Sequence, residues 1–502
     1  MTPVLRLSPD DNVLLARDDV PAGALLPEGT IAVRTAVGRG HKIAAEAIAT
    51  GAPIRRYGQI IGFASRDIAA GDHVHLHNVE LRPFDRHSDV GASTRPTDRI
   101  VPAATYRGIV RADGRVATRN YLGIVSTVNC SATVSRAIAD RMGRELEGHE
   151  TIDGVVAITH ASGCGMAAEG EAMDVLRRTV AGYVRHVNFA GVLLIGLGCE
   201  DNQIARLLAA ESLTPGDRLR TMTVQDAGGT KATIDWGLGA LREMVPGAAR
   251  VQRGEVPAST LTLALQCGGS DGYSGVTANP ALGACADLLV RHGGTVVLSE
   301  TPEIYGAEHL LTARAVTPEV AEHLLSRIRW WEAYTARHGG EMNNNPSPGN
   351  KDGGLTTIVE KSLGAVAKGG TTNLTAVYEY AESIRGRGLV FMDTPGYDPV
   401  SATGQVAGGA NLMCFTTGRG SAFGCKPVPS IKLATNTPLY QRMRDDMDVD
   451  CGAIATGTAS IPDVGREIFE LVLRVASGER TKSEALGYGD QEFAPWVLGA
   501  TM

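Results

Sequence analysis

The chain has 502 residues and a formal net charge of −7 at pH 7, with a predicted isoelectric point near 6.0. This length allows roughly two to four domains, and the acidic balance argues against a nucleic-acid-binding surface. The sequence has neither an apolar run of about 18 residues nor an N-terminal hydrophobic signal region, so we expect no membrane partner and no export. Its 8 cysteines are then expected to be reduced thiols in a cytoplasmic protein.

Changes in composition along the chain indicate three domains and one linker. Short apolar runs at 13–16, 30–33 and 58–64 alternate with Gly- and Asp-containing turns, which is typical of a small β-rich domain; a helix is expected to begin at Lys42. Farther along, strand-like and helix-like runs alternate, which favours α/β domains with largely parallel sheets. The expected order is a β-rich domain over 1–82, a linker over 83–105, an α/β domain over 106–250 and a C-terminal α/β domain over 255–502. In the last domain, strands are expected at 261–266, 294–298, 388–392 and 411–415.

Four cysteines, Cys130, Cys164, Cys199 and Cys267, each come at the end of an apolar run that is typical of a buried parallel strand. Ligands of open α/β sheets bind at the carboxyl ends of such strands. A thiolate at that position can bind iron or zinc, or act as a nucleophile. The alternative is that these are small core residues at strand ends. Their shared position favours function, and the four are one candidate set of metal ligands.

Histidines gather in the N-terminal domain. His73, His75 and His77 alternate along an expected strand, and a period of two would place them on one face. Imidazoles on one face can ligate a metal or include a general base. His73 and His75 are therefore the other candidate metal ligands, and His75 is also a candidate catalytic residue. His41 and Lys42 follow a glycine-containing turn and are further candidates. An exposed strand face with polar residues is the alternative.

A polar segment opens the second domain. Asp113 and Gly114 form a hairpin-turn signal. Arg115, Arg119 and Asn120 come just before a buried strand, where guanidinium groups suit a substrate carboxylate. A surface turn with solvated arginines is equally compatible with this pattern.

Polar residues also follow the expected strands of the C-terminal domain. Glu300 and Glu303 supply two carboxylates for acid–base or metal chemistry. Small residues next to hydrogen-bonding groups can form a large polar pocket suited to a polyhydroxy acid. The candidate substrate-binding residues in these loops are Ser270, Asp271, Asn350, Lys351, Thr417 and Arg419. Each loop taken alone could simply cap a helix.

Several long motifs occur in one order along nearly the whole chain. They are GHK at 40–42, YGQIIG at 57–62, HVHLHN at 73–78, DGRVATRN at 113–120, GLGCE at 196–200, QCGGSDGYSGVTANP at 266–280, NPSPGNK at 345–351 and TTGRGSAFG at 416–424. On these motifs the chain resembles the altronate/galactarate dehydratase family of sugar-acid hydro-lyases. The HVHLHN motif and TVNC at 127–130 are closer to the altronate branch.

The resemblance implies an N-terminal SAF (β-clip) domain, two further α/β domains and dependence on Fe²⁺ or another divalent cation in its place. It implies a small sugar-acid substrate and, for the assembly, a homo-oligomer such as a dimer. Either the thiolates or the SAF histidines could ligate the iron. The implied reaction removes water from an aldonate or aldarate to give a 2-keto-3-deoxy acid.

That reaction requires a base for the C2 proton and an electrophile for the enediolate oxygens. We expect His41 or another SAF histidine as the acid–base group, with Lys42 beside it. Glu300 and Glu303 are reserve bases. Arg115, Arg119 and Lys351 are expected to bind the substrate carboxylate.

The sequence gives less support to other classes of function. A nicotinamide-dependent dehydrogenase would need a third glycine after Gly196 and Gly198, where position 201 is Asp, so we reject that site. A non-catalytic sugar-acid binding protein would need the pocket without a metal or base. A sulfolactate sulfo-lyase has a similar plan split over two subunits, so a C–S lyase is the alternative within the lyase class.

Overall fold

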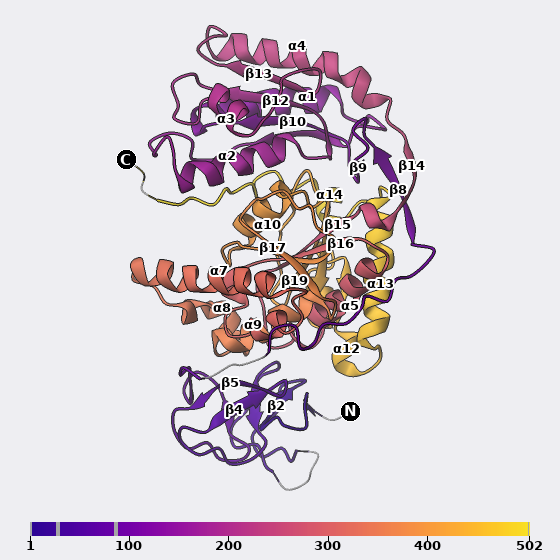
Figure 1. The fold of residues 1–502 in the computed structure, drawn as a ribbon. Helices are drawn as coiled ribbons and strands as arrows, with labels where there is room; N and C mark the ends of the chain where they lie inside the picture. Colours follow the sequence, from indigo (N-terminus) through magenta and orange to yellow (C-terminus); the bar gives the residue numbers. More distant parts are fainter. Residues whose placement is uncertain (1–2, 27–30, 85–88, 500, 502) are drawn as a thin grey trace.

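The computed structural model describes residues 3–26, 31–84, 89–499 and 501. Three domains lie in a row in Figure 1, with the N-terminal domain at the bottom, the C-terminal domain in the middle and the second domain at the top. The C-terminal domain lies between the other two domains although it comes last in the chain. The segment after the N-terminal domain runs past it to reach the second domain. The expected class, a SAF-type domain followed by α/β domains with largely parallel sheets, is confirmed.

The N-terminal domain contains two small antiparallel sheets, ordered β1-β2-β3-β6 and β4-β5-β7. The strands are β1 (Val4–Leu5), β2 (Val13–Ala16), β3 (Lys42–Ala44), β4 (Pro53–Arg56), β5 (Gln59–Ala64), β6 (His73–Val74) and β7 (Val79–Glu80). The runs expected at 13–16 and 58–64 are strands. In the run expected at 30–33, Thr30 lies outside the described residues, and Ala32 forms only an isolated bridge to Leu25.

The helix expected at Lys42 is wrong. Lys42 and Ile43 lie in β3, paired with β2 on one side and with Val74 and His73 of β6 on the other. The alanine-rich run favours a helix locally, but pairing on both sides with neighbouring strands overrides that weak preference. The strand expected through all three histidines is also shorter than predicted, because β6 ends at Val74 and a turn follows.

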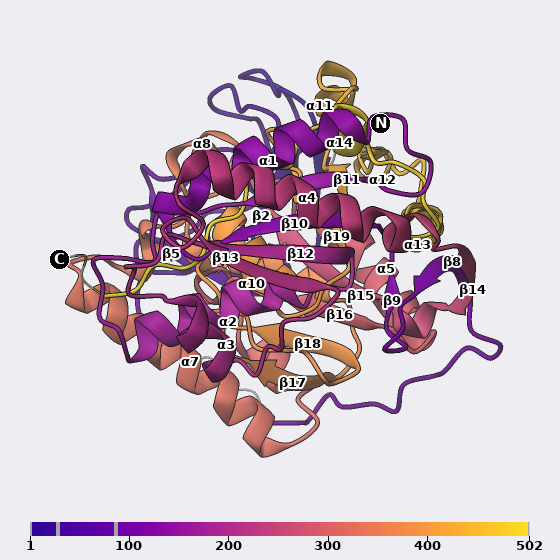
Figure 2. The ribbon, with the colours of Figure 1, turned by 90° about the horizontal axis from the view of Figure 1, so that it is seen from above.

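The second domain is a four-stranded parallel sheet with helices on both faces. Its strands, ordered β11-β10-β12-β13, are β10 (Tyr121–Ser126), β11 (Gly154–Ile158), β12 (Phe189–Gly196) and β13 (Leu219–Thr223). Its helices are α1 (Ala132–Glu145), α2 (Glu171–Val184), α3 (Ile204–Ala210) and α4 (Thr230–Ala249). Apolar side chains of α1 and α4 pack with one sheet face, and those of α2 and α3 pack on the face toward the C-terminal domain (Figures 1 and 2).

A small antiparallel sheet, ordered β14-β8-β9, flanks this domain. Its strands are β8 (Thr105–Val110), β9 (Val116–Ala117) and β14 (Arg253–Pro257). β8 and β9 form the hairpin expected from Asp113 and Gly114, with Gly114 at φ 82°. The described residues between β7 and β8 contain neither helix nor strand.

The C-terminal domain is built on a seven-stranded parallel sheet, ordered β17-β18-β16-β15-β19-β20-β21. The strands are β15 (Thr262–Cys267), β16 (Thr295–Leu298), β17 (Leu374–Tyr378), β18 (Gly388–Met392), β19 (Leu412–Thr417), β20 (Ser430–Ala434) and β21 (Val449–Asp450). All four strands expected in this domain are confirmed to within one or two residues.

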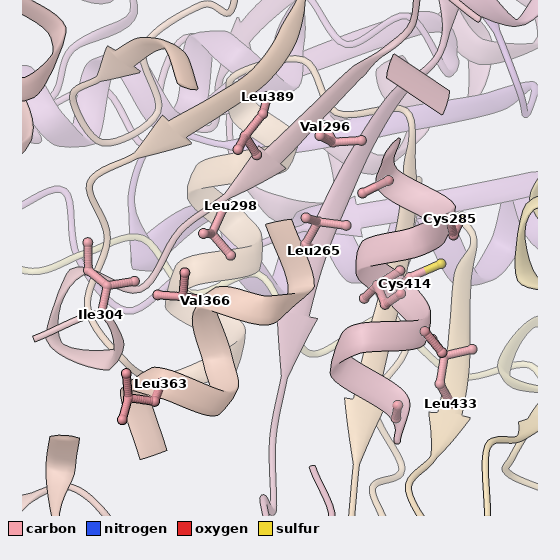
Figure 3. Packing of buried hydrophobic residues seen from close by; sticks show 14 of the residues in the cluster. Leu265, Cys285, Val296, Leu298, Ile304, Leu363, Val366, Leu389, Cys414 and Leu433 are labelled. Carbon is pink, nitrogen blue, oxygen red and sulfur yellow. The ribbon is translucent and has the colours of Figure 1, made fainter. Parts of the chain in front are cut away.

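Helices cover both faces of this sheet. They are α5 (Ala278–Arg291), α6 (His309–Thr312), α7 (Pro318–Arg337), α8 (Pro348–Asp352), α9 (Ile358–Val366), α10 (Asp398–Ala407), α11 (Thr437–Arg442), α12 (Ala453–Thr456), α13 (Ile461–Ala476) and α14 (Lys482–Ala485). Figure 3 shows the packing on one face, where Leu265, Val296 and Leu389 of the sheet contact α5 and α9 residues such as Cys285 and Val366. Among the described residues, no helix combines the length and apolar character needed to cross a membrane.

Candidate active site

A cavity of about 470 Å³ lies at the carboxyl ends of the C-terminal sheet. The chain leaves β15 toward β16 on one side of the sheet and later returns to β19 on the other side, so β15 and β19 form a topological switch point, where α/β proteins bind ligands. The lining residues are Cys267, Gly268, Gly269, Glu303, Asn344, Asn345, Ser347, Gly349, Asn350, Lys361, Gly396, Tyr397, Asp398 and Arg419. Its volume falls in the range of small-ligand sites, about 300–1,000 Å³.

A buried group of charges and one thiol forms the inner wall of this cavity. The Lys368 ammonium donates to Cys267 Sγ at 2.7 Å and to Glu300 Oε2 at 3.2 Å. The Lys361 ammonium donates to Glu303 Oε1 at 2.5 Å. Cys267 Sγ also lies 3.4 Å from Glu303 Oε2 and 3.6 Å from Glu300 Oε2, so the thiol sits between the two carboxyl groups.

The two carboxyl groups differ in their protonation. Burial and the neighbouring charge of Glu303 raise the pKa of Glu300 to about 8. Burial opposes ionisation of Glu303 as well, but the adjacent ammonium groups of Lys361 and Lys368 outweigh it and lower the Glu303 pKa. Burial also raises the pKa of the Cys267 thiol well above its usual value. At neutral pH the pair therefore holds one proton acceptor and one proton donor, the arrangement that acid–base enzymes use.

Backbone strain accompanies this cluster. Glu300 lies two residues after the end of β16 and has φ 70°, in the left-handed region that non-glycine residues seldom adopt. Its N–H donates to Thr394 Oγ1 at 2.9 Å, which holds the turn. Strained non-glycine residues of this kind cluster at active sites and ligand clamps. The conformation turns the Glu300 side chain toward Lys368 and Cys267.

Three imidazoles of the N-terminal domain lie on the other side of α8. His41 Nδ1 is 3.0 Å from His73 Nε2, and the His75 ring lies with its centroid 4.9 Å from that of His41. One ligand atom from each of the three lies within 4.8 Å of the others. His75 Nδ1 is buried and has no hydrogen-bond partner in the described part of the chain.

These residues fit a divalent cation such as Fe²⁺. Imidazole nitrogens are suitable ligands for iron and zinc. Burial lowers the pKa of His73 to about 4 and that of His75 to about 3, so both are in the neutral form that ligates a metal. Cys267, Glu300 and Glu303 also have ligand atoms within 4.8 Å of one another, but two ammonium groups already neutralise their charges. The His41, His73 and His75 set is the better cation site.

Contacts between glycine backbones hold the imidazoles against the C-terminal domain. A Cβ at Gly272 would lie 2.0 Å from Gly40 O, and one at Gly354 would lie 2.2 Å from the same oxygen. His41 Nε2 is 3.1 Å from Asp352 O, at the end of α8. Asp352 lies two residues after the cavity residue Asn350 in the five-residue α8, a rise of about 3 Å at 1.5 Å per residue, so His41 contacts the same short helix that lines the cavity.

A buried ion triad anchors the same domain contact. Lys42 Nζ lies 2.8 Å from Glu360 Oε1 and donates to Gly354 O at 2.6 Å, and Arg56 Nη1 lies 2.5 Å from the same carboxylate oxygen. Burial would raise the pKa of Glu360, but the two cations lower it to about 2. Burial lowers the pKa of Lys42 to about 8. Lys42 therefore positions the N-terminal domain beside the site and does not line the cavity.

The predicted substrate-binding residues of the C-terminal domain fall into two groups. Asn350 and Arg419 line the cavity. Ser270 and Asp271 support the loops behind it: Ser270 O accepts from Asn350 Nδ2 at 2.9 Å, and the Asp271 carboxylate accepts from Thr435 Oγ1 at 3.0 Å. Thr417 Oγ1 accepts from Gly420 N, and Lys351 follows Asn350 in α8 but does not line the cavity.

The structure does not bring Arg115, Arg119 and Asn120 to this site. Arg119 is fully buried and donates twice to the Glu484 carboxylate, at 2.6 and 2.8 Å, so its charge is already neutralised where the second and C-terminal domains meet. Arg115 forms an exposed ion pair with Asp113 at 2.8 Å. Asn120 donates to two backbone carbonyl groups and accepts from Arg111. The assignment of these residues to a substrate carboxylate is corrected accordingly.

The four motif cysteines do not form one cluster. Each follows or ends a parallel strand as expected, but Cys130, Cys164 and Cys199 are exposed at the second-domain sheet, whereas Cys267 is buried at the end of β15. A single metal site with all four thiolates is therefore excluded by their placement in two different sheets.

Sequence reasoning missed Lys361 and Lys368, which set the charges of the cluster. Lys361 and Glu360 interrupt the otherwise apolar run of α9, and all nine residues of α9 are buried. Charged residues are almost never fully buried unless they are paired. A Glu–Lys pair inside an apolar helical run was the available signal.

Comparisons with known proteins agree with this architecture. Three family models match in order: the altronate/galactarate dehydratase SAF domain over 2–82, the second domain of D-galactarate dehydratase/altronate hydrolase over 108–249, and the C-terminal domain of D-galactarate/altronate dehydratase over 258–501. An altronate dehydratase of Bacillus subtilis is 34% identical, with 100% of both chains covered. An altronate dehydratase of Escherichia coli is 35% identical, with 98% of both chains covered. An L-threo-forming galactarate dehydratase of Escherichia coli is 38% identical over 97% of this chain and 95% of its own. Three consecutive family matches and full-length identity above 30% show that the chain belongs to the altronate/galactarate dehydratase family of hydro-lyases.

Proposed function

We propose that the protein dehydrates a six-carbon sugar acid of the aldonate or aldarate class to a 2-keto-3-deoxy acid. The observation that carries this proposal is the pair of buried carboxyl groups with opposite protonation, Glu300 and Glu303, at a polar cavity of sugar-acid size. Relatives named for altronate and for galactarate are 34–38% identical, so both substrate types belong in the assay.

The ionised Glu303 is the proposed base for the C2 proton, because it lines the cavity and its pKa is lowered. The Cys267 thiol donates a proton to the departing C3 hydroxyl, which leaves as water. Protonated Glu300, 3.6 Å from Cys267 Sγ, then returns a proton to the sulfur. The enol that remains tautomerises to the ketone. Glu303 is thereby preferred to His41 as the base, because it lines the cavity whereas His41 belongs to the imidazole group proposed to hold a cation.

Positively charged and amide groups are proposed to bind the substrate carboxylate. Arg419 and Lys361 line the cavity together with Asn345 and Asn350. The guanidinium group of Arg419 is exposed at the cavity rim and can form a bidentate contact with a carboxylate. Lys351, although outside the lining, adds positive charge to α8. These residues orient the substrate so that C2 faces Glu303.

His41, His73 and His75 are proposed to hold Fe²⁺ or another divalent cation. When bound, such a cation supplies Lewis-acid stabilisation of negative charge on substrate oxygens. Glycine contacts at Gly272 and Gly354 fix these imidazoles at the end of α8, next to the cavity-lining Asn350. A homo-oligomer, such as a dimer, remains the expected assembly.

The test is a panel of hexonates and hexarates, with altronate and galactarate included, scored by semicarbazide for 2-keto products. We expect product from at least one acid, loss of activity in EDTA, and recovery with Fe²⁺ and a thiol. Glu303→Gln should lower kcat about 10²- to 10⁴-fold. Because the change leaves the buried Lys361 without its counter-charge, circular dichroism at the assay temperature serves to check that the variant is folded. Release of sulfite from sulfolactate, without keto-acid formation from any sugar acid, would show that the protein is a C–S lyase. Full turnover after chelation would show that the reaction does not need a metal ion.

A further inference from the structure

The second domain contains its own topological switch point. Its strand order is β11-β10-β12-β13, so the chain leaves β10 toward β11 on one side and then crosses to β12 on the other. The loops after β10 and β12 therefore diverge, and crevices outside the carboxyl ends of such strands are where doubly wound sheets bind ligands. The dehydration proposed above uses the other sheet and leaves this position without a role.

All three exposed cysteines of the described chain occur at this one position. Cys130 follows β10, Cys164 lies in the loop after β11, and Cys199 follows β12. The remaining five cysteines are buried. Exposure of three thiols at the ends of three adjacent strands is unusual, because unpaired cysteine is among the most buried residue types.

The three loops contact one another directly beside the cysteines. Asn129 N donates to Ser162 O at 3.0 Å, and Asn202 N donates to Gly163 O at 3.1 Å. Gly163 has φ 100°, and a Cβ there would lie 2.3 Å from Thr127 O, so only glycine permits this approach. The contacts bring Cys130, Cys164 and Cys199 to one surface, each within three residues of a loop–loop hydrogen bond.

The surroundings of these thiols suit a bound metal group. Gln225 Nε2 donates to Cys199 Sγ at 3.4 Å, and hydrogen bonds to the sulfurs are among the features that tune thiolate-bound clusters. Nearby carboxylates are already occupied: Glu200 accepts from Thr127 Oγ1 at 2.8 Å, and Asp201 accepts from Gly165 N at 2.9 Å. The exposed sulfurs are the soft ligands of this surface.

The spacing of the sulfurs argues against a single ion bound by all three cysteines. Two sulfurs on one zinc ion at about 2.3 Å each cannot be more than about 4.6 Å apart. The three sulfurs are not among the sets whose ligand atoms all lie within 4.8 Å of one another. In an iron–sulfur cluster each cysteine binds a different iron, so the sulfurs lie farther apart than around one ion.

We propose that Cys130, Cys164 and Cys199 ligate an iron–sulfur cluster of the [4Fe–4S] type. Three cysteines leave one iron without a cysteine ligand and open to water or to an oxygen of a small molecule. Cys267 takes no part, because it is buried in the other sheet and bound to Lys368. This site does not depend on the dehydration proposed for the C-terminal cavity.

The experiment is anaerobic reconstitution of the full-length protein with Fe²⁺, sulfide and a thiol, followed by removal of unbound reagents. We expect about four acid-labile sulfide per chain and about five iron, four in the cluster and one at the imidazole site, with a broad visible charge-transfer absorption and an electron paramagnetic resonance signal after reduction. Each of Cys130→Ser, Cys164→Ser and Cys199→Ser should lose the sulfide and the absorption. Since the three thiols are exposed, the melting temperatures of these variants should match that of the wild type before reconstitution.

Two controls separate this site from others. Cys285→Ala removes a buried thiol of α5 and should keep the full cluster content. His75→Ala should also keep it, so loss of the dehydratase metal and loss of the cluster are distinguishable. No labile sulfide in the wild type, uptake of zinc or iron without sulfide, or unchanged sulfide content in all three serine variants would each overturn the proposal.

Discussion

The ion triad of Glu360 with Lys42 and Arg56 allows the positioning of the three imidazoles to be tested. The three side chains are 0–1% exposed, so neither cation can be solvated in place. Glu360→Gln keeps the volume of the side chain but removes its charge. Two buried cations then lack a counter-charge, and breaking a buried pair in this way costs about 3–5 kcal/mol. We expect this free-energy cost to destabilise the contact between the N-terminal and C-terminal domains.

Hydrogen exchange measures that contact directly. Every 1.4 kcal/mol corresponds to about a factor of ten, so slow amides of the N-terminal domain should lose about two to three and a half orders of magnitude of protection. Glu243→Gln is the matched control, because Arg220 and Glu243 are also 2.5 Å apart but their side chains are 33% and 66% exposed. An exposed pair contributes about 0–1 kcal/mol. Equal exchange in the two variants would refute the reasoning.

The same triad has a defined pH dependence. The pKa of Glu360 is lowered from 4.5 to about 2, so the unfolded chain binds more protons than the folded chain between these values. The stability contributed by Glu360 is therefore fully present above pH 4.5 and is lost as the pH falls toward 2. In the Glu360→Gln variant this part of the acid dependence should disappear.

Four further predictions concern the cavity, the imidazole group and the Arg119 ion pair. Glu303→Gln should lower kcat about 10²- to 10⁴-fold, the usual contribution of a general base, and a smaller loss in single-turnover assays would reassign the base. Glu300 must be protonated to act and its pKa is about 8, so the wild-type rate should fall as the pH rises through that value. Glu300→Gln should remove this fall in rate at high pH. A wild-type rate independent of pH from about 7 to 9 would contradict the role of Glu300 as a proton donor. Arg119→Ala should lower the free energy of unfolding by about 3–5 kcal/mol with an unchanged KM, because it leaves Glu484 unpaired. A raised KM at an unchanged melting temperature would instead indicate that Arg119 binds the substrate. His75→Ala should lose Fe²⁺ binding in anaerobic equilibrium dialysis without sulfide. Retained stoichiometric binding would show that the metal binds at another site.

Much of the fold could be predicted because buried parallel strands are nearly continuous apolar runs. β15, β16, β18 and β19 were all expected from such runs, and the polar loops that follow them hold the cavity. The carboxyl-end rule also predicted that Cys267 lies where ligands bind, and its sulfur contacts Glu303, 36 residues later in the chain. Periodicity and topology carry this kind of information without any knowledge of packing.

The errors came from positions where long-range contacts outweigh local pattern. Lys42 begins a run with helical composition, but pairing with β2 and β6 makes it a strand residue. Arg119 has a side chain that suits a substrate carboxylate, and only the fold reveals that Glu484, 365 residues later, already occupies it. Likewise Lys368 reaches Cys267 across 101 residues, a pairing that no local signal specifies.

The two switch points explain why cysteines with similar sequence contexts have different chemistry. At β15 the strand end is covered by α9 and by the buried lysines, so Cys267 is kept neutral by desolvation and can exchange a proton only with its neighbours. In the loops after β10 and β12 the cysteines are exposed. A soft metal group needs thiolates and an entry path, whereas a proton relay needs an enclosed thiol next to carboxyl groups. The proposed roles, proton transfer for Cys267 and ligation for the three exposed cysteines, therefore follow from burial more than from residue type.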